Sequence, residues 1–148
     1  MIKKVETNQE YNDALSIRKA VFIEEQQVPA EEEIDQFEDS ATHFIAYDDH
    51  GQPLATARYR EVDGVVKVER VAVAKNARGL GLGKKLITFL ENDAIQQGYL
   101  EFKLGAQTHA VPFYESLGYI TYGEIFMDAN IPHLNMYKKY KTQKSISL

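Results

Sequence analysis

Apolar and polar residues follow one another in two kinds of blocks, and these blocks predict strands and helices. Short blocks with continuous or alternating apolar residues predict strands at residues 2–6, 42–49, 54–62, 65–73 and 99–107, and two more after residue 119. Blocks with apolar residues three and four apart predict helices that start after residue 7, at residue 82 and near residue 109. This order predicts an α/β fold with a mixed, mostly antiparallel central sheet flanked by helices.

The predicted ends of these elements carry residues suited to caps and turns. Thr7 and Glu10 have the spacing of a capping box at the start of the first helix. Asp63 and Gly64 form a dipeptide typical of a tight hairpin. Gly98 is placed to end the central helix as its C′ residue. The spacing of apolar residues also predicts one buried face on each of the two longer helices. The face of the first helix contains Tyr11, Ala14, Leu15, Arg18, Val21 and Phe22, and that of the central helix contains Leu82, Leu86, Leu90 and Ala94.

Length and composition predict one ordinary globular domain. The chain has 148 residues, of which 44% are hydrophobic and 26% charged. We expect a single domain over residues 1–141 and a flexible tail over residues 142–148. The chain contains no cysteine, which excludes disulfides, thiolate metal sites and a cysteine nucleophile. The first twenty residues lack the apolar core of a signal peptide, and we expect a soluble cytoplasmic protein that has no membrane partner.

The net charge of −5 argues against nucleic-acid binding, which normally needs a basic surface. The charge is uneven, because residues 24–39 contain eight acidic side chains and no basic one. We expect this segment to be a solvated surface, with a place near a cationic substrate as the alternative. The basic residues at 138–144 predict a second solvated surface.

The most informative stretch runs from residue 69 to residue 91, where a strand leads through a glycine-rich turn into a helix. The turn contains Arg78, Gly79, Gly81 and Gly83. The first turn of a helix has unpaired N–H groups and the positive end of the helix dipole. Glycines there allow an anion to approach the backbone closely, so the turn predicts a phosphate or pyrophosphate site.

Two common phosphate-binding patterns do not fit this turn. A P-loop ending at Lys84 would need glycine where Arg78 stands and Ser or Thr where Lys85 stands. A dinucleotide-binding fingerprint starting at Gly79 would need glycine at position 84, which is lysine. The turn does satisfy the pattern R-x-x-G-x-G with Arg78, Gly81 and Gly83.

That third pattern resembles the coenzyme A pyrophosphate loop of the GNAT superfamily of N-acyltransferases. The sequence of residues 104–119, LGAQTHAVPFYESLGY, is similar to the second signature of that superfamily. Residues 18–35 and 131–138 resemble its small bacterial YjcF/ElaA-like branch. The resemblance implies the GNAT acyl-CoA N-acyltransferase fold and an N-acetyltransferase. Such an enzyme moves an acetyl group from acetyl-CoA to a primary amine by direct transfer, without a metal.

The resemblance also implies where the coenzyme would bind. Val71, Ala72 and Val73 would make main-chain hydrogen bonds to the pantetheine arm. The residues implied around the pyrophosphate are Arg78, Gly79, Leu80, Gly81, Leu82, Gly83 and Lys84. Tyr114 would point toward the coenzyme sulfur as the general acid.

The general base stays open, because the superfamily does not share one base position. Glu69 is a candidate because regular alternation would place it on one strand face with Val71 and Val73, toward the cleft. His109 is a candidate because it begins the predicted short helix near the sulfur. His133 could reach the substrate side.

Three further histidine and arginine side chains are predicted to have other roles. His43 and His50 are expected to be structural, and Arg18 stands among apolar positions, which indicates a paired or functional charge.

The acceptor is expected to be a small molecule or peptide amine, and a homodimer is left open. The first alternative function is a catalytically silent acetyl-CoA-binding sensor or regulatory protein. The second is an enzyme or binder of another nucleotide that uses the same loop.

Overall fold

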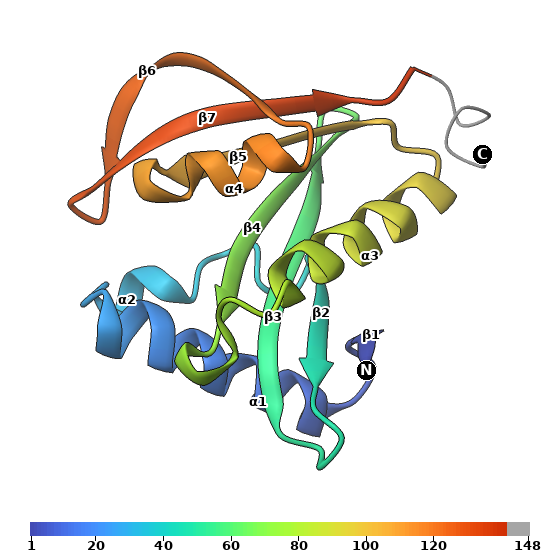
Figure 1. Ribbon diagram of the computed structural model, residues 1–148, viewed down its shortest axis with the longest axis vertical. Coiled ribbons are helices and arrows are strands. Elements are labelled where there is room, and N and C mark those ends of the chain that lie inside the picture. Colours follow the sequence, from blue (N-terminus) through green and yellow to red (C-terminus); the bar gives the residue numbers. More distant parts are fainter. Residues whose placement is uncertain (142–148) are drawn as a thin grey trace.

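A computed structural model describes residues 1–141, which form one mixed sheet with helices on both faces (Figure 1). The strands are β1 (Ile2–Lys4), β2 (Thr42–Tyr47), β3 (Pro53–Val62), β4 (Val65–Val73), β5 (Glu101–Gln107), β6 (Ile120–Asp128) and β7 (Ile131–Lys139). The α-helices are α1 (Asn8–Arg18), α2 (Ala30–Glu33), α3 (Leu82–Gln96) and α4 (Val111–Ser116). A π-helix η1 (Lys19–Glu25) extends α1, and short 3₁₀ turns η2 (Lys75–Ala77) and η3 (Thr108–Ala110) precede α3 and α4. The predicted order and fold class are confirmed.

The sheet order β1-β2-β3-β4-β5-β7-β6 places the one parallel pair, β4 and β5, near its middle. These two strands pair only at Val66 with Phe102 and at Lys67 with Lys103. Beyond that point they diverge, so the sheet opens into two arms (Figure 1). One arm carries β1–β4, and the other carries β5–β7 with α4. Within the part of the chain that the structure describes, no helix is long and apolar enough to cross a membrane.

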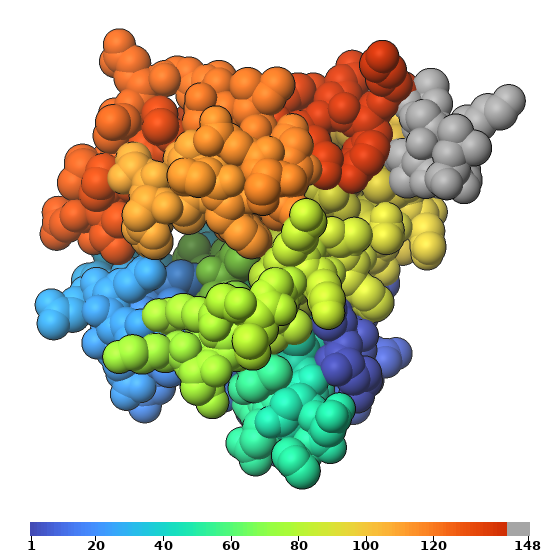
Figure 2. Space-filling view, in the orientation of Figure 1, coloured from blue at the N-terminus to red at the C-terminus, as the bar shows by residue number. Residues whose placement is uncertain are grey.

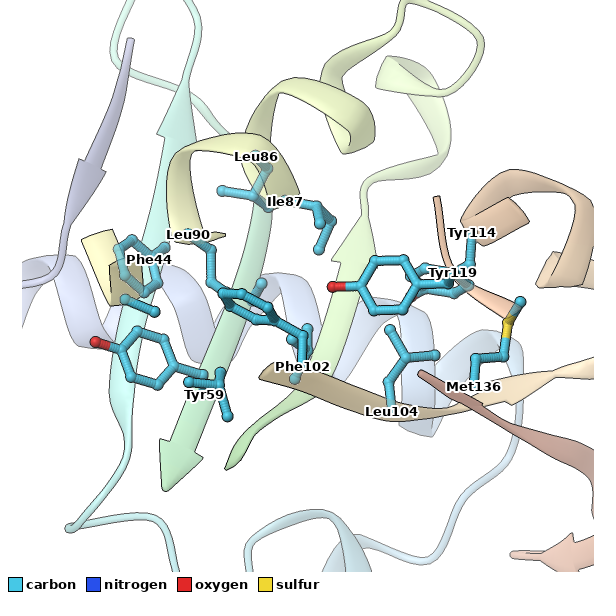
Figure 3. Close-up of a cluster of buried hydrophobic side chains, with 14 of the residues drawn as sticks. Phe44, Tyr59, Leu86, Ile87, Leu90, Phe102, Leu104, Tyr114, Tyr119 and Met136 are labelled. Atoms are coloured by element: carbon cyan, nitrogen blue, oxygen red, sulfur yellow. The ribbon is translucent and has the colours of Figure 1, made fainter. Parts of the chain in front are cut away.

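Each face of the sheet has its own core. Leu86, Ile87 and Leu90 of α3 pack against Phe44 and Phe102 of the sheet, and all five side chains are fully buried (Figure 3). On the other face, α1 and η1 bury a smaller cluster of Ala14, Ile17, Val21, Ile45 and Ala72. The larger core runs along both arms and joins them where β4 and β5 are still paired.

The local signals at the ends of these elements are confirmed. Thr7 and Glu10 form a capping box, in which the Glu10 N–H donates to Thr7 Oγ1 at 3.1 Å and the Thr7 N–H donates to Glu10 Oε1 at 3.0 Å. Asp63 and Gly64 both have positive φ, at 53° and 82°, as the tight hairpin between β3 and β4 requires. Gly98 follows α3 with φ of 99°, a left-handed conformation that favours glycine.

A bulge in β4 changes which side chains share a face. On β3 the single residue Ala57 lies opposite both Arg70 and Val71, and Arg70 has a φ of 53°. Val71 and Val73 therefore pack toward the α3 side of the sheet, whereas Glu69 lies on the α1 side. The expectation that Glu69 shares a face with these valines is wrong, because the extra residue reverses the alternation.

The acidic segment is only partly a solvated surface. Glu33 and Glu38 are buried, and Asp35 is half-buried. Their carboxylates make ion pairs with Arg18 and Arg58, both of which are only 1% exposed. The segment is therefore held to the sheet by buried charges, and the paired role that we predicted for Arg18 is confirmed.

The basic stretch at residues 138–144, predicted to be a solvated surface, differs from that prediction at Lys138. Lys138 is half-buried, and its Nζ lies 2.9 Å from Glu91 Oε1 beneath the ring of Tyr140. Residues 142–144 of that stretch, and the tail predicted over residues 142–148, lie outside the described residues.

Candidate active site: the cleft between β4 and β5

The divergence of β4 and β5 opens a cleft of about 480 Å³. Figure 2 shows a hollow between the orange block around α4 and the blue and yellow-green segments below it. Side chains from both arms line this cleft, among them Phe22, Gln26, Glu69, Tyr114 and His133. All three candidate bases predicted from the sequence, Glu69, His109 and His133, lie in its wall.

The glycine turn lies between the end of β4 and the start of α3. Gly79 and Gly81 have φ values of 82° and 75°, and Gly81 is the N-cap residue of α3. No side chain among residues 1–141 caps this helix. The N–H groups of the first turn are therefore available to an anion, as the sequence predicts.

Gly83 has a different role, because it allows α3 to pack closely on α4. A Cβ atom at this position would lie 3.2 Å from Cζ of Phe113 and 3.6 Å from Cγ2 of Val73. The third glycine of the motif thus holds the two helices and the end of β4 together.

Arg78 points toward η1 rather than toward the first turn of α3. Its Nη2 donates to Glu25 Oε1 at 2.8 Å, and its Nε donates to the Val73 carbonyl at 3.0 Å. Arg78 and Glu25 are both substantially exposed, with 43% and 34% of their side-chain surfaces open to solvent. The arginine thereby links the glycine turn to the π-helix that carries Phe22 and that is followed by Gln26.

Tyr114 lies on α4 and reaches the cleft from the α3 side of the sheet. The residue is 8% exposed and packs edge-on against Phe113 and Tyr119, with ring centroids 5.0 and 5.9 Å away. Its hydroxyl makes no hydrogen bond to any residue among 1–141, and burial raises its pKa. The hydroxyl therefore stays protonated at neutral pH and can donate to a molecule in the cleft.

Glu69 is surrounded by cations. Its Oε1 accepts hydrogen bonds from Arg58 Nη2 at 3.1 Å and from Arg60 Nε at 3.0 Å, and its Oε2 lies 3.6 Å from Lys67 Nζ. These contacts hold the Glu69 carboxylate against the arginines of β3.

His109 lies in η3 and is exposed at the mouth of the cleft. Its Nε2 is 2.7 Å from Gln107 Oε1, and Gln107 Nε2 donates to Gln26 Oε1 at 2.8 Å. These side chains connect the end of β5 with η1, and so they bridge the two arms across the cleft.

His133 is only 9% exposed, unlike His109. Its Nδ1 lies 2.7 Å from the Ile131 carbonyl, and its ring stacks on Phe126 with 5.5 Å between ring centroids and 25° between ring planes.

The sequence gives no signal for the hydrogen bond between Gln26 and Gln107, because the two residues are 81 positions apart. The remaining histidines lie away from the cleft: His43 binds the Glu38 carbonyl, and His50 lies in the turn after β2.

Comparisons with known proteins show the family of the chain. A family model described as the acetyltransferase (GNAT) domain matches residues 4–140. The chain belongs to this GNAT family. It is 44% identical over 131 residues to the uncharacterised N-acetyltransferase YjcF of Bacillus subtilis, covering 88% of this chain and 93% of the relative.

Solved structures of GNAT proteins share the fold along nearly the whole chain. The Escherichia coli protein ElaA superimposes with a TM-score of 0.82 at 27% identity, covering 94% of this chain and 99% of that one. An aminoglycoside 6′-N-acetyltransferase, solved with coenzyme A, superimposes with a TM-score of 0.75 at 18% identity, covering 94% and 96%. At that identity the likeness shows the GNAT fold alone. The GNAT relatives together support acyl transfer as the general activity.

Proposed function

We propose that this GNAT protein transfers an acetyl group from acetyl-CoA to a primary amine of a small molecule or peptide. The observation that carries the proposal is the uncapped glycine turn, which follows β4, the strand whose residues 67–71 line the cleft together with Tyr114. A diphosphate at the turn would direct the rest of the coenzyme along the open edge of β4. The lack of cysteine fits a reducing compartment, and we propose the cytoplasm as its location.

The coenzyme would use backbone groups more than side chains. The proposed pyrophosphate contacts are Arg78, Gly79, Leu80, Gly81, Leu82, Gly83 and Lys84. A single favourable charge–dipole contact at a helix start contributes about 0.3–1 kcal/mol, and several amides would act on one pyrophosphate here. Beyond Lys67 the edge of β4 has no pairing with β5, so Val71, Ala72 and Val73 can bind the pantetheine arm there.

The chemistry requires a neutral amine and a protonated leaving group. A lysine-like amine with a pKa near 10.4 is neutral in about one molecule in 2500 at pH 7, so a proton acceptor accelerates the reaction. The neutral amine attacks the thioester carbonyl, and a backbone N–H of β4 can stabilise the oxyanion. As the carbon–sulfur bond breaks, Tyr114 donates its proton to the thiolate. The chain has no cysteine to carry the acetyl group, in agreement with direct transfer.

Glu69 and His109 stay predictions as catalytic residues. The three cations around Glu69 favour a role in holding the bulge of β4 and the adjacent arginines. His109 lies at the mouth of the cleft, where it can meet the incoming amine.

Turnover tests the proposal directly. Thiol release from acetyl-CoA would be followed with a panel of primary amines, including polyamines, aminoglycosides and lysine peptides. Acetylated product would then be identified by mass spectrometry. We expect at least one amine to give saturable turnover. Tight acetyl-CoA binding without turnover on any amine would instead support the catalytically silent sensor.

The ion pair between Arg78 and Glu25 gives a separate test of the coenzyme site. If Arg78 turns to the pyrophosphate, it must leave Glu25, so E25Q is expected to tighten acetyl-CoA binding. Exposed ion pairs contribute up to about 1 kcal/mol, which corresponds to a gain of at most about fivefold in Kd. R78A is expected to weaken binding, and calorimetric titration of both variants measures the two effects. Weaker binding by E25Q would show that the pair holds the turn in its binding conformation instead.

A further inference from the structure

We propose that His133 is the general base that takes the first proton from the acceptor ammonium in the cleft. This inference rests on the acetyl-transfer function proposed above and names the residue that makes the amine reactive.

The hydrogen bond at Nδ1 fixes which ring nitrogen can act. The Ile131 carbonyl, 2.7 Å from Nδ1, can only accept a hydrogen bond, so Nδ1 of the neutral ring carries the proton. Nε2 then has a lone pair, and it makes no hydrogen bond to any residue among 1–141. His133 is 9% exposed and lines the cleft, so Nε2 is an unpaired acceptor on a mostly buried side chain that an incoming amine can reach.

The ring is held in place from two sides. It stacks on Phe126 at 5.5 Å between centroids, in addition to the bond with Ile131. Both partners lie beside the tight turn that joins β6 to β7, where Ala129 and Asn130 have φ values of 51° and 62°. A base that is fixed in this way needs no rearrangement before it accepts a proton.

The sheet places His133 across the opening from Tyr114. His133 lies directly opposite Gln107 in the β5–β7 ladder. The next pair along the ladder is Ala106 with Leu134, and side chains of consecutive pairs point to opposite faces of the sheet. Ala106 packs in the same core as Tyr114, so His133 lies on the other face of the sheet. Two groups on opposite faces can reach one molecule only where β4 and β5 diverge, and both line the cleft there. The amine and the sulfur of the coenzyme thus have separate proton partners.

The other titratable and charged groups in the cleft wall are less suited to this step. They are Glu32 and Glu33 of α2, Lys67, Glu69 and Arg70 of β4, His109 of η3, Tyr114 of α4 and Asp128 of β6. Glu33 and Glu69 are ion-paired with arginines, and Lys67 and Arg70 are themselves cations. Glu32, His109 and Asp128 are exposed, where water competes for their lone pairs.

The protons balance with one base and one acid. His133 Nε2 takes a proton from the ammonium, and the nitrogen lone pair forms the C–N bond to the thioester carbonyl. The tetrahedral intermediate collapses, the C–S bond breaks, and the thiolate takes the proton of Tyr114. The nitrogen of the new amide then gives its extra proton to the deprotonated Tyr114, which restores the tyrosine hydroxyl. His133 releases its proton to water. The products are the amide, coenzyme A and one proton.

The test compares pH profiles of wild type, H133N and H133Q on the best primary amine of the panel. Asparagine can still donate to the Ile131 carbonyl but cannot accept the proton, and glutamine is a second variant of similar size. H50Q, in the exposed turn after β2, is the matched control and should match wild type. Thermal melting and acetyl-CoA binding show whether each variant is folded and loads the coenzyme.

We expect H133N and H133Q to lower kcat/KM for the amine about 100-fold at pH 7, with unchanged affinity for acetyl-CoA. The deficit should shrink to less than tenfold near pH 9.5, because the neutral fraction of a lysine-like amine rises from about one in 2500 at pH 7 to about one in nine. A deficit that is equal at all pH values would show a structural role and overturn the assignment. An active wild type with equally active variants would overturn it too. A wild type that binds acetyl-CoA but acetylates no amine would overturn the proposed function, and the base with it.

Discussion

Replacing Tyr114 with phenylalanine is expected to lower kcat by about 100-fold or more, while the Kd for acetyl-CoA changes little. A positioned acid or base typically raises the rate 10²–10⁴-fold. The Tyr114 hydroxyl has no hydrogen-bond partner among residues 1–141, and Tyr114 lines the cleft, so its hydroxyl is free to donate to a bound molecule. The buried ring keeps its contacts with Phe113 and Tyr119 in the variant, so folding should be preserved. Steady-state kinetics and calorimetric titration with acetyl-CoA measure the two quantities.

The control for this experiment is Y122F, because Tyr122 lies exposed on the edge strand β6. Its kcat should equal that of wild type. If Y114F also kept a kcat within twofold of wild type, the thiolate would obtain its proton elsewhere, and the acid assignment would be wrong.

The second large effect is expected from R58M, which should lower the free energy of unfolding by about 3–5 kcal/mol. Arg58 is fully buried and lies 2.6 Å from Asp35, 2.5 Å from Glu38 and 3.1 Å from Glu69. Removing Arg58 leaves the buried cluster with three carboxylates that each have one cation fewer, which is more costly than removing a surface pair. Urea unfolding measures the difference. K139M removes an exposed pair with Glu101 and should show little change.

The acid dependence of stability gives this prediction a second readout. Burial alone would raise the pKa of Glu38, but hydrogen bonds from Arg18 and Tyr11 outweigh it and lower the pKa. Burial likewise opposes the effect of Arg58 on Asp35, whose pKa is also lowered. Carboxyl groups with lowered folded-state pKa values contribute stability above their unfolded pKa values, near 4, and lose it as the pH falls.

Wild type should therefore lose stability steeply below about pH 4. In R58M the carboxylates of Asp35, Glu38 and Glu69 share fewer cations, and protonation relieves their mutual repulsion. The difference between the two proteins should accordingly shrink on acidification. A difference that stays constant from pH 7 to pH 3.5 would mean that Arg58 stabilises the fold by packing rather than by charge.

The sequence predicts local structure well here because local residues determine it. The capping box at Thr7, the turn at Asp63 and Gly64, and the end of α3 at Gly98 depend on side chains within a few positions. The order of strands and helices follows from the period of the apolar residues. The glycine turn is also a local feature, so both its position and its link to α3 could be predicted.

Features that depend on remote partners could not be predicted in the same way. The bulge at Arg70 has no glycine to mark it, and it reverses the face on which Glu69 lies. The acidic segment reads as a solvated surface until Arg18 and Arg58 are known to lie beneath it. The role of His133 depends on the Ile131 carbonyl and on the register with β5, neither of which the amino-acid types reveal.

Acetyl-CoA binding at the glycine turn can be measured by the thermal midpoints of wild type and G81V with and without the coenzyme. Gly81 has a φ of 75° and no atom within 4 Å of a built Cβ, so valine strains the backbone and covers the amides without a clash inside the fold. At 100 times its Kd a ligand adds about 2.7 kcal/mol, which raises Tm by roughly 5–10 °C for a domain of this size. We expect that rise for wild type with acetyl-CoA but not with ATP or NAD, and little rise for G81V. An unchanged Tm for wild type, or equal rises for both proteins, would contradict it.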